Sequence, residues 1–224
     1  MIEIRDVTHS YGKRVVLRSV SATLTERRIG VIGANGSGKS TFARLLNGLV
    51  VPETGAVTVH GVSTARDAAA VRRAVGFVFT DPDAQIVMPT VAEDVAFGLR
   101  KRKLGKDKTE RLVAEALERV GLGDYGDHPA HLLSGGQKQL LALTSVLVTE
   151  PTILVCDEPT TLLDLPNTRR VLDLIDALPQ QVVMVTHDLE SVAAYDRVLV
   201  FHDGRLVADD APGPAVEHYR ALVT

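Results

Sequence analysis

The sequence lacks the features that would place it in an oxidising compartment, on nucleic acid or inside a bilayer. Its 224 residues contain one cysteine, Cys156, so no disulfide can form within the chain and a reducing compartment is expected. A net charge of −3 gives no general attraction to nucleic acid. No apolar run approaches the roughly 20 residues that span a bilayer, and the charged, alternating start MIEIRDVTHS is unlike a signal peptide. We therefore expect any membrane role to come through partner proteins.

What the sequence does have is a hydrophobic content of 45%, enough for the core of one large domain. Apolar and polar residues alternate near the N-terminus, which predicts half-buried strands. Short continuous apolar runs are typical of strands buried on both faces of a sheet, and they occur at 28–33, 74–79, 152–157, 181–186 and 197–204. Helical patterns separate several of these runs, so the sequence predicts an α/β fold with a parallel sheet.

Residues 90–149 have a helical pattern and predict an insert in this core. Thr90 and Glu93 have capping-box spacing at its start, and residues 107–110 are a second possible cap. The helix expected after that cap has an apolar stripe at Leu112, Ala116, Leu117 and Val120. We expect one domain over 1–224, with a core at about 1–89 and 150–224 and a helical subdomain at about 90–149.

Residues 33–40, GANGSGKS, fit the phosphate-loop pattern G-x-x-x-x-G-K-[S/T]. The glycines allow a tight turn whose N–H groups point at phosphate, and the helix that follows adds about half a positive charge at its N-terminus. Lys39 is expected to reach the β- and γ-phosphates, and the Ser40 hydroxyl to bind magnesium. The predicted nucleotide contacts are Gly33, Ala34, Asn35, Gly36, Ser37, Gly38, Lys39, Ser40 and Thr41. This motif does not by itself separate an ATPase from a GTPase or a kinase.

Two later strands end in polar groups that suit nucleotide chemistry. Asp157 ends one strand and is expected to hold magnesium through water, while Glu158 is expected to orient or deprotonate an attacking water. His187 ends the next strand, where a γ-phosphate contact is expected. Solvated acids and a surface histidine are the plainer interpretations, but the phosphate loop favours the catalytic ones.

Residues 133–137, LSGGQ, form a second glycine motif. Ser134 and Gln137 have the spacing of an ordinary capping box at a helix start. The alternative is a second anion site, in which the N–H groups of Gly135 and Gly136 and the helix dipole face a phosphate.

Together these motifs resemble those of the ABC-type ATPases over essentially the whole chain. LSGGQ is similar to their signature, Asp157 and Glu158 to their acidic pair, and His187 to their switch histidine. TTLLD, which ends at Asp164, resembles the loop after the acidic pair, which contacts the second subunit. Tyr11 resembles the aromatic residue that stacks on adenine, although a tyrosine before a glycine is otherwise only a turn residue.

The resemblance implies a phosphate-loop core with a mainly parallel sheet, an N-terminal antiparallel β-subdomain and an inserted helical subdomain. It also implies ATP and Mg²⁺ as cofactors, with Lys39, Glu158 and His187 as catalytic residues. Two domains would bind ATP between them, with the phosphate loop of one facing the signature of the other. One chain carries one copy of each motif, so we expect it to pair with a second ABC ATPase chain, identical or related. ATP would favour closure of the pair, and hydrolysis would release it.

Residues 81–99, DPDAQIVMPTVAEDVAFGL, are similar to the ATPases of energy-coupling-factor importers of vitamins and metals. The closest resemblance is to the ATPase of biotin importers, with cobalt or nickel importers next. It implies transmembrane coupling and substrate-binding subunits as partners, and a peripheral position on the cytoplasmic face of the cell membrane. Thr80 and Gln85 lie in the segment expected to dock those partners.

Thr80 is where the sequence departs from the family pattern. The family's magnesium- and water-contacting glutamine would fall at this position, and a threonine hydroxyl is shorter than a carboxamide. A water could bridge from Thr80, Gln85 could move in, or hydrolysis could be tuned differently. A low-turnover, nucleotide-gated structural subunit therefore stays an alternative, as does a soluble ABC ATPase that acts on nucleic acid or ribosomes.

Six Lys/Arg occur in residues 100–108, RKRKLGKDK. The plain interpretation is a solvated helix end whose dipole favours cations. The alternative is attraction to anionic lipid head groups, worth about 1 kcal/mol per residue close to the surface.

Overall fold

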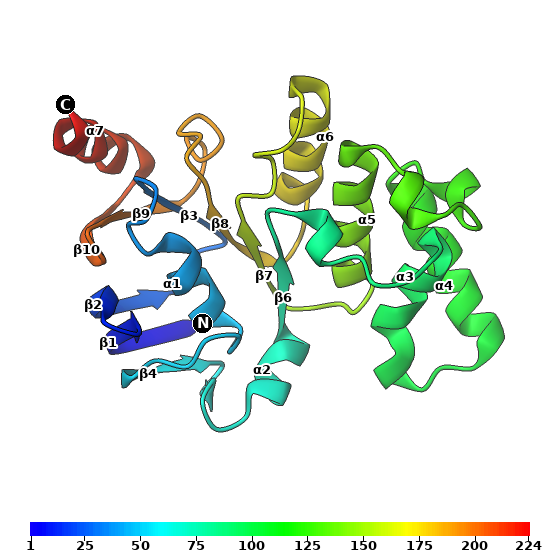
Figure 1. Ribbon diagram of the computed structural model, residues 1–224, viewed down its shortest axis with the longest axis horizontal. Helices are drawn as coiled ribbons and strands as arrows, with labels where there is room; N and C mark the ends of the chain where they lie inside the picture. The colour runs from blue at the N-terminus through cyan, green and yellow to red at the C-terminus, as the bar shows by residue number, and fades with distance from the viewer. The chain divides into compact units, whose positions relative to one another are not determined.

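The computed structural model describes all 224 residues, and the chain forms two compact units (Figure 1). The first unit comprises Met1–Phe77, Thr152–Glu158 and Pro179–Thr224. The second comprises Val78–Pro151 and Pro159–Leu178. None of the helices is both long enough and apolar enough to cross a membrane.

The N-terminal sheet of the first unit has four antiparallel strands in the order β2-β1-β4-β5. Along β1, Ile2 and Ile4 are buried because alternate side chains of a strand share a face, and a register shift between Ile4 and Val7 buries Val7 while Arg5 is exposed. The half-buried strands expected from the alternating pattern are thus confirmed. The strands are β1 (Ile2–Tyr11), β2 (Arg14–Leu24), β4 (Thr54–Val59) and β5 (Val62–Ser63).

The second sheet has six strands in the order β10-β9-β3-β8-β7-β6 and is mainly parallel. Every residue of β3 and of β7 is buried, as their continuous apolar runs predict. Because β3, β7 and β8 are parallel, their carboxyl ends lie at the same edge. The strands are β3 (Arg28–Gly33), β6 (Val75–Val78), β7 (Ile153–Asp157), β8 (Gln181–Val185), β9 (Arg197–His202) and β10 (Arg205–Asp210).

Three helices belong to the first unit: α1 (Lys39–Leu46), α2 (Ala68–Ala74) and α7 (Pro212–Val223). Helix α1 packs on β3, β7 and β8. The ring centroid of Phe42 on α1 lies 4.9 Å from that of Phe201 on β9, and both side chains are fully buried. Burial of each stabilises the fold by about 1.5–3 kcal/mol. This packing holds α1 against the sheet, and residues 34–38 connect the carboxyl end of β3 to the N-terminus of α1.

The second unit is helical, with α3 (Val91–Leu99), α4 (Lys106–Arg119), α5 (Gly135–Leu147) and α6 (Leu165–Asp176). Helix α3 packs on α4 and α5, and α5 packs on α6 (Figure 1). A short 3₁₀ turn at Pro82–Ala84 precedes α3, and others lie between the helices at Arg100–Arg102, Gly123–Tyr125 and Ala130–Leu132.

The start of α3 confirms the expected capping box, since the Thr90 side chain accepts from the N–H of Glu93 and Glu93 bonds back to the backbone of Thr90. The cap expected at 107–110 is wrong. Helix α4 begins earlier, at Lys106, with Gly105 as its N-cap and no side-chain cap. Asp107 lies inside the first turn, where its charge favours the helix dipole without capping it.

Candidate nucleotide-binding site

The phosphate loop connects β3 to α1. Gly33 and Gly38 have φ of 148° and 103°, which side chains other than that of glycine rarely adopt. A Cβ at Gly38 would also lie 2.7 Å from the Val16 carbonyl oxygen, and one at Gly33 would collide with the Phe201 carbonyl. Residues 34–36 at the tip are exposed, whereas Ser37 is buried. The glycines are thus required by the shape of a loop whose tip is open to a ligand.

Lys39 is the first residue of α1, and its ammonium group lies at the phosphate loop. Its Nζ donates to the carbonyl oxygens of Gly33 at 2.7 Å and Ala34 at 3.0 Å. Burial lowers the pKa of Lys39, and the Glu158 and Asp157 carboxylates partly oppose that change. The structure therefore holds a cation against the loop, as binding of a polyphosphate requires.

Ser40 and Asp157 lie together although they are far apart in the sequence. The Ser40 hydroxyl donates to Asp157 Oδ1 at 2.8 Å, and Arg44 Nη2 lies 3.8 Å from Oδ2. Burial raises the pKa of Asp157, while the Ser40 hydrogen bond and Arg44 lower it by less. A bound cation would favour the ionised carboxylate.

This pair suits Mg²⁺, which binds through one or two protein oxygens and takes its other ligands from phosphate and water. No group of three or more His, Cys, Asp or Glu side chains could hold a metal ion by itself. The chain thus offers a hydroxyl and a carboxylate for a cation that arrives with a nucleotide.

Glu158 and His187 form the second pair at this edge of the sheet. Glu158 Oε2 lies 2.6 Å from His187 Nδ1. The backbone of Glu158 has φ 54°, an uncommon value for a residue other than glycine, and its N–H donates to the Val185 carbonyl at 2.9 Å. The structure therefore brings together the two groups that the sequence predicts to act on the γ-phosphate side.

Tyr11, at the end of β1, is 51% exposed. Its ring contacts the ring of His9 edge-on, with centroids 4.9 Å apart. No role for His9 was predicted from the sequence. The available signal for this contact was the spacing of His9 from Tyr11, because residues two apart on a strand share a face.

A basic cavity of about 550 Å³ adjoins the phosphate loop in the first unit. Gly36 lines it, and Arg14 Nη2 lies 3.3 Å from where a Cβ of Gly36 would be. Asp203 is the single acidic residue of its lining. The cavity has four cationic side chains, none of which forms an ion pair in the structure: Lys13, Arg14, Arg18 and Arg205. Lys13 lies in the turn before β2, Arg14 and Arg18 lie on β2, and Arg205 begins β10, so the sequence alone did not single these cations out.

In the second unit, Ser134 is the N-cap of α5 and forms a full capping box with Gln137. The Ser134 N–H donates to Gln137 Oε1 at 2.9 Å, and the Gln137 N–H donates to Ser134 Oγ at 3.3 Å. The N–H groups of Gly135 and Gly136 lie in the first turn, where α-helices have no carbonyl partner for them. The plain interpretation is confirmed, and the second anion site stays a prediction with its donors in place.

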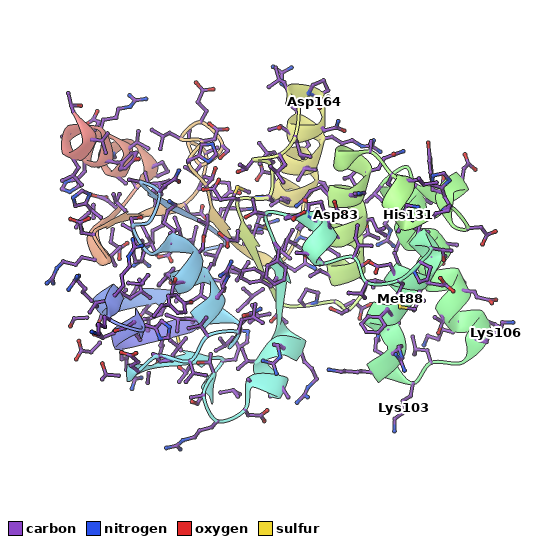
Figure 2. All side chains as sticks on the ribbon, viewed as in Figure 1. Asp83, Met88, Lys103, Lys106, His131 and Asp164 are labelled. Atoms are coloured by element: carbon purple, nitrogen blue, oxygen red, sulfur yellow. The ribbon has the colours of Figure 1, made fainter.

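Asp164 is the N-cap of α6. Its Oδ1 accepts from the backbone N–H of Asn167 at 3.0 Å and from the Asn167 side chain at 2.8 Å. Leu162 and Leu165 beside it are 64% and 63% exposed. Figure 2 shows Asp164 at the end of its helix. A fixed loop with two exposed leucines suits a contact with another chain.

The segment after β6 is held by glutamine side chains. Gln85 Oε1 accepts from the Phe79 N–H at 3.0 Å, and its Nε2 donates to the Ala142 carbonyl on α5 at 3.4 Å. Gln139, which is buried, donates to the Phe79 carbonyl at 3.4 Å. If Gln85 moved to take the role of the glutamine that the family has at position 80, it would therefore break these two hydrogen bonds.

Asp94 is a residue whose role the sequence did not reveal. It is 4% exposed, and its Oδ1 accepts from the N–H groups of Val87 at 2.9 Å and Met88 at 3.1 Å. Its Oδ2 accepts from the Ser145 hydroxyl at 2.8 Å. One carboxylate on α3 thus fixes both the loop before that helix and α5. An acid on the inner face of an amphipathic helix was the available signal.

The fold and this site define a phosphate-loop nucleoside triphosphatase. The family described as ABC transporter matches residues 17–161. A putative ABC transporter ATP-binding protein of Deinococcus radiodurans is 57% identical over 100% of this chain and 99% of its own length. The chain belongs to the ABC transporter ATP-binding family, whose members hydrolyse ATP to drive transport.

Two further relatives bear names that include a substrate. The biotin transport ATP-binding protein BioM of Rhizobium etli is 48% identical over 99% of this chain and 98% of its own length. The cobalt import ATP-binding protein CbiO of Syntrophus aciditrophicus is 42% identical over 95% and 79%. The chain is therefore similar to ATP-binding subunits of importers.

Two solved structures match the fold. CbiO1 of Clostridium perfringens, part of the transporter complex CbiONQ, has a TM-score of 0.85 at 29% identity and covers 99% of this chain and 92% of its own. The ATP-binding cassette MJ0796, in a dimer bound to ADP and Pi, also has a TM-score of 0.85, at 26% identity over 95% and 99%. The predicted fold class is confirmed.

Proposed function

We propose that this chain is the ATP-hydrolysing subunit of an energy-coupling-factor importer for a small vitamin, with biotin as the favoured substrate. The observation that carries this proposal is the similarity to the biotin transport protein over nearly the full length of both chains. The cobalt import relative is less similar and makes a cobalt or nickel importer the second candidate.

In this proposal the phosphate loop binds the ATP phosphates, and Tyr11 stacks on the adenine. Ser40 and Asp157, which are hydrogen-bonded at 2.8 Å, would hold Mg²⁺, and the cation would neutralise charge on the phosphates. Glu158 orients or deprotonates the water that attacks the γ-phosphate, and His187 contacts that phosphate. The hydrogen bond between Glu158 and His187 supports a shared role.

The catalytic unit is a dimer in this proposal. The N–H groups of Gly135 and Gly136 bind the γ-phosphate of ATP held by the other chain, with Ser134 and Gln137 fixing the helix end. The MJ0796 cassette is a dimer, which supports this arrangement. Because the glycine contacts exist only in the closed dimer, ATP favours closure and its hydrolysis favours opening.

The membrane partners dock on the segment after β6. Asp94 fixes the backbone at residues 87–88, and Lys138 pairs with Asp83 at 2.7 Å. On this fixed segment the apolar side chain of Val87 is 61% exposed, and Asp83, Met88 and His131 line a hollow of about 280 Å³ (Figure 2). A rigid segment with an exposed apolar residue suits transmission of movement to transmembrane subunits, which would keep the chain peripheral, on the cytoplasmic face of the cell membrane.

The substrate is tested by uptake. The chain would be co-expressed with the membrane proteins that co-purify with it, in cells that cannot make biotin, and uptake of labelled biotin and of cobalt would be measured with wild type and with Glu158→Gln. The proposal predicts biotin uptake that is lost in the variant. Cobalt uptake without biotin uptake would contradict it and would leave ATP-driven import intact.

Thr80 keeps a low-turnover role as an alternative, so we compare the ATPase rates of wild type and Thr80→Gln in the assembled complex. An importer ATPase is expected to turn over with the native threonine, at a rate within about tenfold of the glutamine variant, because an ordered water can replace a direct hydrogen bond at little cost. Activity that occurs only in Thr80→Gln would favour the structural role.

A further inference from the structure

His9 is buried in the first unit, yet its ring nitrogens have no hydrogen-bond partner in the structure. The residue lies on β1 and is 9% exposed, and neither its Nδ1 nor its Nε2 forms a hydrogen bond. A neutral imidazole carries one N–H donor, and a buried donor without a partner destabilises a fold. The imidazole therefore does not serve hydrogen bonding within the chain.

The imidazole of His9 does contact the phenol ring of Tyr11. The two ring planes make an angle of 86° and their centroids lie 4.9 Å apart, which is an edge-to-face arrangement. Such pairs are favourable beyond the area that they bury, because the positive edge of one ring meets the negative face of the other. Tyr11 is half-exposed at the end of its strand, so this contact restricts a side chain that would otherwise change rotamer more freely.

The pairing of β1 with β2 is irregular on both sides of His9. Leu17 is the partner of His9, and the register shifts both before and after this pair. Ser19, which lies in one shift, has φ 52°, and Val16 lies in the other. Bulges bend a strand and change the direction of its side chains, and they are frequent beside active sites. The irregular pairing at His9 therefore affects where the end of the hairpin, and Tyr11 with it, is held.

The same stretch of β2 packs against the phosphate loop. A Cβ at Gly38 would lie 2.7 Å from the Val16 carbonyl oxygen and 2.8 Å from Leu17 Cδ2. Leu17 is fully buried and lies opposite His9 in the sheet. His9 thus contacts Tyr11 on its own strand and pairs with a residue that contacts the loop. This arrangement links the position of the Tyr11 ring to the position of the phosphates.

We propose that His9 is a positioning residue, which orients the Tyr11 ring for a nucleotide base at a fixed distance from the phosphate loop. This inference rests on the proposed stacking of Tyr11 on adenine, and His9 acts through Tyr11 without contact with the nucleotide. Because the ring is held before ATP arrives, less conformational entropy is lost when the base stacks on it. His9 therefore contributes to the affinity for a nucleotide, and not to the affinity for a phosphate chain that has no base.

Binding of two ligands to the purified full-length chain tests the proposal. The Kd values for Mg-ATP and for inorganic triphosphate, which lacks a base, would be measured by competition with a fluorescent ATP analogue. His9→Leu removes the ring and keeps an apolar side chain of similar size. We expect this variant to raise the Kd for ATP about fivefold and to leave the Kd for triphosphate unchanged.

Two further measurements separate positioning from a purely structural role. The melting temperature of His9→Leu should not fall, because the variant removes a buried polar group that has no partner. His9→Phe should retain the ATP affinity of wild type, because it keeps a ring against Tyr11. A matched control is His128→Leu, since His128 forms an edge-to-face pair with Tyr125 in the second unit, with centroids 5.5 Å apart. This control should bind both ligands like wild type.

A double variant shows whether His9 acts through Tyr11. Tyr11→Leu should raise the Kd for ATP at least about fivefold, the usual effect of losing a stacked base, and His9→Leu should add nothing in that background. Additive losses, equal losses for ATP and triphosphate, or a loss in His9→Phe as large as that in His9→Leu would overturn the proposal.

The role of His9 and the stacking of Tyr11 fail in different ways. If Tyr11→Leu weakened ATP binding while His9→Leu bound ATP like wild type, the role of His9 would be wrong and the stacking would stand. If Tyr11→Leu bound ATP like wild type, the proposed stacking on adenine would be wrong, and the role of His9 with it.

Discussion

Asp157 and Glu158 are adjacent in the sequence, but different contacts hold them. Asp157 is the last residue of β7. Its side chain is 2% exposed and accepts a hydrogen bond from the Ser40 hydroxyl. The left-handed backbone at Glu158 turns the next carboxylate onto His187, with 14% of its side chain exposed. The left-handed conformation at Glu158 makes the two side chains point to different partners. This suits a division of roles, in which one acid binds a cation and the other acts on the attacking water.

The raised pKa of Asp157 gives the first prediction. Its ordinary value is 3.8, and burial raises it in the folded state, so this group contributes stability below about pH 4 that is lost as the pH rises through the folded value. Asp157→Asn removes the buried charge and keeps an acceptor for Ser40. Above that pH we expect the variant's melting temperature without nucleotide to exceed that of wild type, by about 2–4 °C for each 1 kcal/mol gained.

Melting curves of both proteins between pH 3 and pH 8 would check this expectation, and the difference should shrink at the acid end. Mg²⁺-dependent ATP binding should be lost in Asp157→Asn. A variant less stable than wild type at pH 7 would contradict this prediction, because it would show that the ionised Asp157 side chain does not destabilise the folded protein.

Arg14 is the second test at this scale. Its guanidinium lies beside Gly36 and has no carboxylate partner, so we expect it to bind a phosphate of ATP. Arg14→Met should raise the Kd for ATP about tenfold, the effect of losing about 1.4 kcal/mol from a charge-assisted hydrogen bond. Titration with a fluorescent ATP analogue would measure it, with Arg66→Met as the control. Unchanged affinity would place Arg14 outside the nucleotide site.

At the scale of elements, α3 and α5 begin in the same way. Each has a hydroxyl N-cap three residues before a Glu or Gln that completes a capping box. Only α5 begins with two glycines. A comparison of the two caps can therefore distinguish a purely structural role from a role in nucleotide binding.

We expect Thr90→Ala and Ser134→Ala each to lower the free energy of unfolding by about 1 kcal/mol, the usual cost of losing an N-cap. Only Ser134→Ala should also weaken ATP-driven dimerisation, because the N-terminus of α5 would bind the γ-phosphate of the ATP held by the second chain. Urea unfolding and light scattering would measure the two effects. Equal dimerisation in both variants would limit Ser134 to capping.

Elements were predictable where a local pattern decides them. The apolar runs predicted β3 and β7, and the spacing of Thr90 and Glu93 predicted the start of α3. The start of α4 could not be predicted in this way. Its N-cap, Gly105, has no side chain, and the charged residues around Asp107 resemble a cap. Asp94 and Arg14 were also beyond local patterns, because their partners come from other elements.

At the scale of the whole molecule, the two units divide the predicted chemistry. The first holds the phosphate loop, Asp157, Glu158 and His187, and the second holds the signature and the docking segment. Each glycine motif was predictable from its residues, but the distances that join Ser40 to Asp157 and Glu158 to His187 come from the parallel sheet. In the proposed dimer, a second chain would complete the site, which is consistent with one copy of each motif in one chain.

The most direct test of this account is the mass in solution of Glu158→Gln with saturating Mg-ATP, measured by light scattering after gel filtration. The variant should bind ATP without hydrolysing it, because it lacks the carboxylate that we propose to act on water. ADP, and Lys39→Ala in the same background, serve as controls that should remain monomeric. The account predicts a mass twice the 24.1 kDa of one chain with ATP, whereas a mass of 24.1 kDa in saturating Mg-ATP would contradict it.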